Sequence, residues 1–166
     1  MAGQQQDYIL RQIELLGRFA ARLRRKGKPL DDKDRLELNE TLLLALHLQE
    51  QNFGMPAAKF LSLTADEQVA ALRKGESTAD GQARCLVYAT ILKETAVLYA
   101  FRDNEDLALG ARQLALYLAL SLALEPPTDG RAVHALIDEL RADLGEAGLH
   151  APTRELLGQF EQSRPA

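Results

Sequence analysis

The sequence has no tryptophan and few aromatic side chains of any kind. Phe and Tyr together make up 5% of its 166 residues, and β-branched residues are scarce beside the many Leu and Ala. Strands favour Val, Ile, Thr and aromatic residues, whereas Leu and Ala lose little side-chain freedom in a helix. Nowhere does the chain alternate between apolar and polar residues as a half-buried strand does. We therefore predict an all-α protein.

Cysteine is also scarce, since Cys85 is the only one and no disulfide can form within the chain. No histidine lies near it in the sequence, so we expect a buried, small apolar side chain and not a nucleophile. Residues 1–6 are polar and rich in Gln. They lack the apolar stretch of a signal peptide, and we expect them to form a disordered N-terminus. These features favour a cytoplasmic protein.

The sequence has no overall excess of positive charge. Its 24 acidic and 20 basic residues give a net charge of -4, which makes nucleic acid an unlikely partner. Residues 18–28 are a local exception, with six basic residues and no acidic one. They could bind nucleic acid or anionic lipid weakly through a patch made of Arg22, Arg25, Lys26 and Lys28. The alternative, which we prefer, is that these charges end a helix and face the acidic residues at 31, 32 and 34.

Only one apolar run approaches the length of a membrane span, at residues 107–124. Arg112 and Gln113 interrupt it, and acidic residues stand at both ends. A charge deep in a bilayer costs about 2.5–3.5 kcal/mol on insertion scales. We therefore expect no membrane contact, and we predict that this segment is the shielded central helix of a bundle.

Apolar residues spaced three and four apart predict about seven to eight helices in a single domain at 7–166. Helix 7–26 has one stripe, widened by Tyr8, Leu15 and Phe19. In helix 31–51, Leu36, Leu43 and Leu46 lie along one side, with Leu38 and Leu42 beside them. A short helical piece is expected at 55–61, and a capping box at 64–67 starts the next helix. The polar stretch 76–81 is expected to be a loop. Further helices are predicted at 83–102, 107–124, 130–144 and 152–162.

The short link at 103–105 makes the two helices around it antiparallel neighbours. Ala96 and Ala108 stand where these helices would cross, with Tyr99 to fill the gap and Ala115 seven residues on. On these residues, the hairpin at 83–125 resembles a tetratricopeptide (TPR) unit. It departs from that pattern at Arg112, where an aromatic residue is usual, and in the late proline at 126. The resemblance implies antiparallel helical hairpins in a right-handed TPR-like or bundle arrangement.

A broader resemblance covers most of the chain. Residues 7–10 (DYIL), 12–14 (QIE) and 60–67 (FLSLTADE) precede the hairpin in that order. The whole is similar to a family of uncharacterised bacterial helical proteins with a degenerate TPR-like core, although the part after residue 150 is short for it. That family implies a fold and supplies no activity, cofactor or functional residue.

The first helix of a TPR unit lines its inner groove. The resemblance therefore implies a candidate interaction groove made of Thr90, Lys93, Val97, Ala100 and Phe101. This set is more apolar than a groove left in water should be. Either a partner covers it or the protein's own first helix does, and we expect the first helix.

We predict no catalytic, metal-binding or cofactor-binding residues. The three histidines have no His or Cys at ligand spacing, and His47 with Glu50 offers too few ligands for structural zinc. The carboxylates Glu139 and Asp143 could face one another, as could Glu37 and Glu40, but such pairs are common on solvated helix faces. Gly17 and Gly110 lie inside predicted helices, where we expect them to permit close helix packing.

Three functions remain open from the sequence. The first is a non-enzymatic helical protein-interaction or scaffold module, working through apolar helix faces with a protein partner or as a homodimer. The second is an accessory subunit or an enzyme with an unrecognised site. The third is a weak nucleic-acid binder that uses the basic run at 18–28. We prefer the first.

Overall fold

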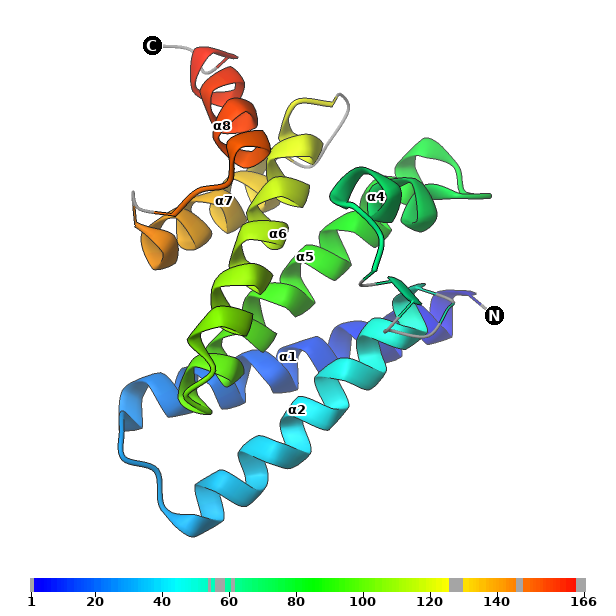
Figure 1. The fold of residues 1–166 in the computed structure, drawn as a ribbon. Coiled ribbons are helices and arrows are strands. Elements are labelled where there is room, and N and C mark those ends of the chain that lie inside the picture. The colour runs from blue at the N-terminus through cyan, green and yellow to red at the C-terminus, as the bar shows by residue number, and fades with distance from the viewer. Residues whose placement is uncertain are drawn as a thin grey trace.

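A computed structural model describes residues 2–53, 55, 59–60, 62–125, 130–145 and 148–163 of the protein (Figure 1). Over these residues the chain is all-helical and contains no strand, as predicted. The helices are α1 (Ala2–Lys26), α2 (Asp32–Phe53), α4 (Ala65–Arg73), α5 (Thr78–Phe101), α6 (Glu105–Ala123), α7 (Gly130–Leu144) and α8 (Ala151–Ser163). They pack in pairs, and the expected antiparallel hairpin is α5 with α6.

The central helix of the fold is α5. It packs against α1, α2, α4, α6 and α7, and none of its residues from Gly81 to Phe101 is exposed. We had predicted this place for residues 107–124, which form most of α6. That prediction holds only in part: α6 packs against α4, α5, α7 and α8, but Leu107 and Leu109 near its start are exposed. Among the described residues α6 alone has the length and apolar character of a membrane span, and half of that window is buried within the fold.

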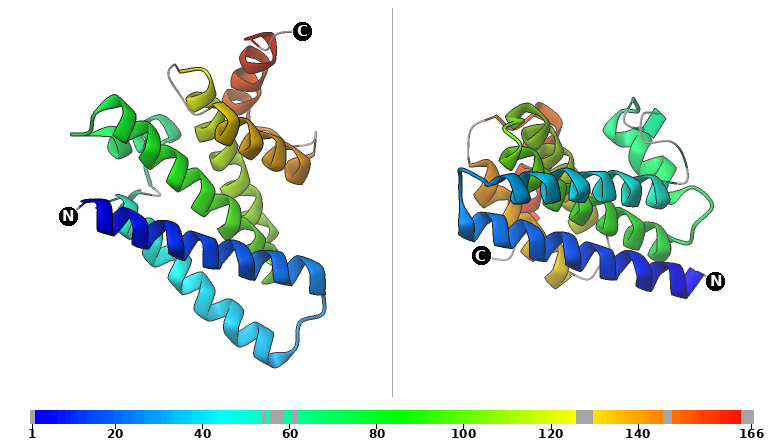
Figure 2. Two further views of the ribbon diagram at one scale, coloured as in Figure 1. Left: turned by 180° about the vertical axis from the view of Figure 1, so that it is seen from behind. Right: turned by 90° about the horizontal axis from the view of Figure 1, so that it is seen from below.

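The core consists of two apolar clusters that share α5. One lies between α1, α2 and α5 and includes Ile91 and Leu98 of α5. The other joins α5 to α4, α6, α7 and α8, with Tyr88 and Leu92 from α5. The left view of Figure 2 shows the α1–α2 pair at the bottom and α8 at the top, while α1 and α7 meet at the ion pair of Arg24 with Asp143. The two faces of α5 thus hold together two groups of helices.

Helix α1 buries the predicted stripe and begins earlier than expected. Its buried residues are Ile9, Ile13, Leu16, Phe19, Ala20 and Leu23, whereas Tyr8 and Leu15 are exposed. Residues 2–6, which we expected to be disordered, form the first turns of this helix. The polar composition of these residues misled us, because Gln and Ala are good helix formers and need no apolar partner to continue a helix.

Helix α2 buries only part of the predicted apolar side. Leu38, Leu42, Ala45 and Leu48 face the core, whereas Leu36 is 62% exposed and Leu43 is 69% exposed. Leucines lie all around this helix, so their spacing is compatible with more than one buried face. Contact with α5 decides between them.

The capping box at the start of α4 is confirmed. The Thr64 hydroxyl accepts from the Glu67 N–H at 3.2 Å, and the Glu67 carboxylate accepts from the Thr64 N–H at 2.9 Å. A second cap was missed: the Ser77 hydroxyl accepts from the Asp80 N–H, so α5 begins at Thr78 inside the stretch expected to be a loop. The short helix expected at 55–61 lies largely outside the described residues.

A close approach at a glycine occurs at Gly81, in the first turn of α5. A methyl group there would lie 3.0 Å from Cγ of Arg73, so the arginine stem occupies the space that a side chain would need. The expected roles of Gly17 and Gly110 are different in the structure. A methyl group on Gly17 would meet only ordinary contacts at 3.8 Å, and one on Gly110 would meet nothing within 4 Å. Neither glycine is needed for close helix packing.

Arg73 also holds the carboxylate that follows α6. Its Nη1 donates to Oε1 of Glu125 at 2.7 Å, and Nε2 of Gln82 donates to the same oxygen at 3.3 Å. The Arg73 hydrogen bond, which outweighs partial burial, holds the pKa of Glu125 below its usual 4.5. Three separate elements, α4, α5 and the end of α6, meet at this carboxylate.

We expect the variant Glu125→Gln to lose less stability than the wild type when the pH falls below about 4.5. Because the pKa is lower in the folded chain, Glu125 stabilises the fold above the unfolded-state pKa. That contribution disappears as the pH drops through the folded-state pKa. At neutral pH the variant should be destabilised by no more than about 1 kcal/mol, since the pair is partly exposed. Urea unfolding at several pH values measures both effects, and the exposed Glu14→Gln is the control.

Candidate functional site

The predicted groove residues do not form an open groove. Val97 is buried, and Thr90, Lys93, Ala100 and Phe101 are half-buried. Gly17, Ala20 and Ala21 of α1 lie opposite Lys93 and Val97, and the Lys28 ammonium lies 6.0 Å from the centre of the Phe101 ring. The protein's own first helix and the segment after it therefore lie over much of this surface, which is the alternative that we had preferred.

A cluster of charges fills the junction of α1, α5 and α7. Lys93 Nζ lies 2.6 Å from Glu139 Oε2 and 3.1 Å from Glu94 Oε1, and Arg24 Nη2 lies 3.0 Å from Asp143 Oδ2. These pairs line a cavity of about 250 Å³. Glu139 is 57% exposed, as expected of a solvated helix face, and Glu139 and Asp143 each bind a cation from another helix. The pairing connects helices and leaves no free carboxylate couple for acid–base chemistry here.

Most of the predicted basic patch is paired with acidic residues. Arg22 meets Glu37 at 2.6 Å, and Lys28 meets Asp103 at 2.6 Å. Lys26 reaches both Asp31 and Asp34. Arg25 is exposed, and it has no ion pair in the part of the chain that the structure describes. Three of the four cations are thus neutralised locally, which weakens any field that nucleic acid would sense.

The cysteine and the histidines are scattered through the fold. Cys85 is buried, as predicted, and burial raises the pKa of its thiol. His47 is exposed on α2, His134 packs edge-on against Phe160, and His150 stands before α8. Within the described ranges, no three His, Cys, Asp or Glu side chains gather as metal ligands would.

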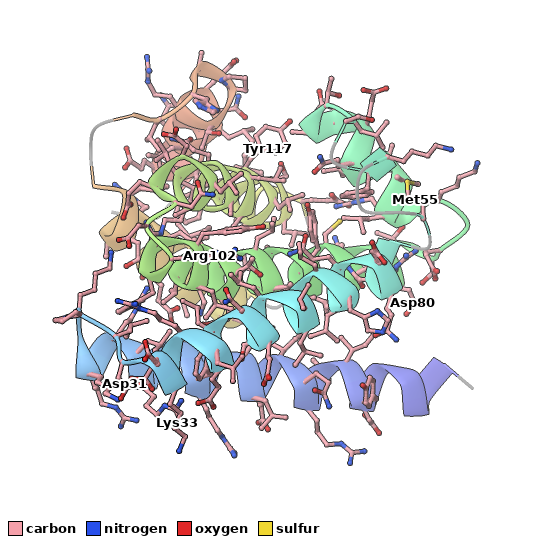
Figure 3. All side chains as sticks on the ribbon, turned by 60° about the horizontal axis from the view of Figure 1, so that its bottom comes forward. Asp31, Lys33, Met55, Asp80, Arg102 and Tyr117 are labelled. Atoms are coloured by element: carbon pink, nitrogen blue, oxygen red, sulfur yellow. The ribbon has the colours of Figure 1, made fainter. Side chains whose placement is uncertain are left out.

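The α1–α2 pair presents apolar residues to solvent. Leu36 and Leu43 lie on the side of α2 turned away from the core. On α1, the exposed Tyr8 and Leu15 share a row with Arg22, because residues seven apart stack on one helix face. Since Arg22 pairs with Glu37 of α2, this row borders α2. Figure 3 shows the two helices side by side, with their outer side chains projecting from the rest of the molecule.

A separate cleft of about 380 Å³ lies between the start of α4, the outer side of α6 and the start of α8. The Tyr117 hydroxyl of α6 donates a hydrogen bond to Oδ1 of Asp66 in α4 (Tyr117 is labelled in Figure 3). Burial, and next the adjacent Asp66, raise the pKa of Tyr117 to about 12. The phenol is therefore neutral at physiological pH and remains a hydrogen-bond donor.

Two buried glutamines fix the walls of this cleft. Gln113 Nε2 donates to the Gly148 carbonyl, and its Oε1 accepts from the His150 N–H at 3.2 Å, which ties the start of α8 to α6. Gln68 Nε2 donates to the carbonyls of Phe60 and Leu63, both at 3.3 Å. Its Oε1 is buried and has no hydrogen-bond partner in the described structure. Sequence reasoning missed this cleft, and the only signals were the capping box at 64–67 and the polar Gln113 inside an apolar helix.

A comparison of the chain with protein-family models, curated proteins and solved structures finds no match. The likeness to TPR units and to a bacterial helical family thus stays a prediction from the sequence. The arguments on function that follow rest on the geometry of the chain itself.

Proposed function

We propose that this protein is a non-enzymatic helical interaction module that works through the outer face of the α1–α2 pair. The exposure of Leu36 and Leu43 supports this proposal most directly. They are the two most exposed large apolar side chains among the described residues, and they lie seven apart on one side of one helix. Apolar residues grouped on a surface are typical of protein-interaction sites.

A second copy of the chain is the partner that we propose first. A twofold-symmetric contact uses the same patch on both chains. An antiparallel pair of α2 helices, crossing near residues 39 and 40, would place Leu36 of each chain beside Leu43 of the other. Such a homodimer, or a scaffold that binds a different protein with the same face, agrees with the cytoplasmic location proposed from the sequence.

The two other functions have less support. An accessory subunit or an enzyme would use the cleft beside Tyr117, where Asp66 is a candidate acid–base group but lies exposed on α4. A nucleic-acid binder would need the basic run at 18–28, whose cations largely face carboxylates. The α1–α2 face has no comparable obstacle. Its exposed apolar side chains can contact a partner without first breaking an ion pair.

Sedimentation velocity over a range of concentrations tests the proposal with the double variant Leu36→Glu, Leu43→Glu. We expect the wild type to form a dimer and the double variant to stay monomeric with unchanged circular dichroism. Leu109→Glu is the matched control, since Leu109 is an exposed leucine on α6, and it should behave as the wild type. The proposal fails if the wild type stays monomeric in sedimentation and if, in addition, the wild type and the double variant capture the same proteins from a cell extract.

A further inference from the structure

The cleft between α4, α6 and α8 is independent of the α1–α2 face. We propose that it binds an alkylammonium group, carried either by a free amine or by a lysine side chain of a peptide. Its volume of about 380 Å³ is suited to a small group, since ligand pockets usually span about 300–1,000 Å³.

The charges in the lining favour a cation. Among the described residues, Asp66 is the one carboxylate in the lining, and no described Lys or Arg lines the cleft. The hydrogen bond from Tyr117 occupies Oδ1 of Asp66, which leaves Oδ2 to accept from a ligand. Gln68 is only 4% exposed, and its unpartnered Oε1 adds a negative partial charge close by. In the part of the lining that the structure describes, the other ionisable side chains are His150 and Tyr117.

The apolar part of the lining suits the alkyl stem of such a group. Leu63, Leu114 and Pro152 come from three different segments of the wall. The Tyr117 ring can lie against the ammonium as well, because cations are attracted to the faces of aromatic rings within about 6 Å. Since Gln113 and Gln68 hold the walls through buried hydrogen bonds, the cleft needs little reorganisation to accept a ligand.

The starts of α4 and α8 border the cleft, and helix N-termini ordinarily attract anions. At α4, however, the capping box already occupies the N–H groups of Thr64 and Glu67. The Asp66 and Glu67 carboxylates there also offset the helix dipole. At α8, Pro152 supplies no N–H to the first turn. An anion would thus meet a carboxylate and few donors, which leaves the cation as the better ligand.

Three probes of equal size test the charge: n-butylammonium chloride, 1-butanol and sodium butyrate, each titrated into the full chain and followed by ¹H–¹⁵N NMR. We expect butylammonium to shift the amide signals of Gly110, Tyr117 and Thr153 saturably. Butanol should bind about tenfold more weakly, because it lacks the charge-assisted hydrogen bond, and butyrate should not bind. Asp66→Asn should weaken butylammonium binding about tenfold for the same reason.

A second variant tests whether butylammonium binds in this cleft. Gly110→Leu puts a side chain into open space at the mouth of the cleft, so it should abolish butylammonium binding while the fold is kept. Gly158→Leu is the matched control: it lies in α8, also faces open space and does not line the cleft. It should bind as the wild type does.

Tighter binding of butyrate would overturn the proposal in favour of an anion site, and equal binding of butanol would reduce the cleft to an apolar one. Absence of butylammonium binding, or binding that survives Gly110→Leu, would also overturn it. Comparison with N-acetyl-lysine N-methylamide separates the sources: tighter binding of this probe than of butylammonium assigns a peptide, and the reverse assigns a free amine. None of these results depends on the self-association of the α1–α2 face.

Discussion

Replacing Leu98 with Ala should lower the free energy of unfolding by about 2–5 kcal/mol, whereas Leu36→Ala should change it by less than about 0.5 kcal/mol. Both substitutions remove the same atoms. Leu98 is fully buried between α5 and the α1–α2 pair, and its loss leaves a cavity that the packed helices cannot fill. Leu36 is 62% exposed and leaves no cavity. Urea unfolding followed by circular dichroism measures both values.

The same pair of variants separates the core from the proposed interface. Leu36→Ala should weaken self-association, as measured by sedimentation velocity at concentrations where the wild type is dimeric. Its stability should be unchanged when unfolding is measured at a concentration where the wild type is monomeric. Equal destabilisation by the two substitutions would mean that Leu36 is covered in the free chain. That result would contradict both the burial described above and the exposed α2 face.

Replacing Lys93 with Met should cause the second-largest loss in the free energy of unfolding, after Leu98→Ala. The side chains of Lys93 and Glu94 are only 18% and 14% exposed, so the variant leaves the Glu94 carboxylate with little water and without the ammonium that lies 3.1 Å from it. Removing one partner of a buried pair costs about 3–5 kcal/mol, and the remaining exposure reduces our expectation to about 2–3 kcal/mol. The double variant Lys93→Met, Glu94→Leu should recover most of this loss, because it removes the isolated charge.

The pH dependence of stability tests whether the charge of Lys93 stabilises the folded chain. Burial alone would lower the pKa of Lys93, but the hydrogen bond to Glu139 and the charge of Glu94 outweigh it and raise the pKa above 10.5. A raised pKa in the folded chain means that Lys93 stabilises the fold below about 10.5, and that this contribution is lost as the pH rises through the folded-state value. The wild type should therefore lose its advantage over Lys93→Met at high pH. An advantage that grows with pH would contradict the ion-pair account.

The buried face could be predicted from the sequence for helices with one apolar stripe. It could not be predicted for helices with apolar residues on all sides. In α1 the residues at 9, 13, 16, 20 and 23 leave one choice of buried face. In α2 the leucines offer two, and the structure buries the side with Leu38 and Leu42. The central place of α5 was missed because Lys93, Glu94 and Thr95 make it look amphipathic. Their partners, among them Glu139 and Gln49, come from distant segments that no spacing rule connects.

Contacts between residues close together in the sequence could be predicted at the candidate sites, whereas contacts between distant segments could not. Pairing of Lys26 with Asp31 and Asp34 follows from short separation along the chain and from the charge at a helix end. Pairing of Lys28 with Asp103 and of Arg24 with Asp143 depends on the fold. The cleft brings together residues from 63–68, 110–117 and 150–153, so it exists only once α4, α6 and α8 are in place.

Because α5 contributes residues to both apolar clusters, the two groups of helices contact one another mainly through α5. The proposed association face lies on one group and the alkylammonium cleft on the other, and neither site contacts its counterpart. Any allosteric coupling between them would thus run mainly through α5, with a second route through the ion pair of Arg24 in α1 with Asp143 in α7. The buried middle of α5 should therefore exchange its amide hydrogens slowly, because exchange there requires the helices on both sides of α5 to open.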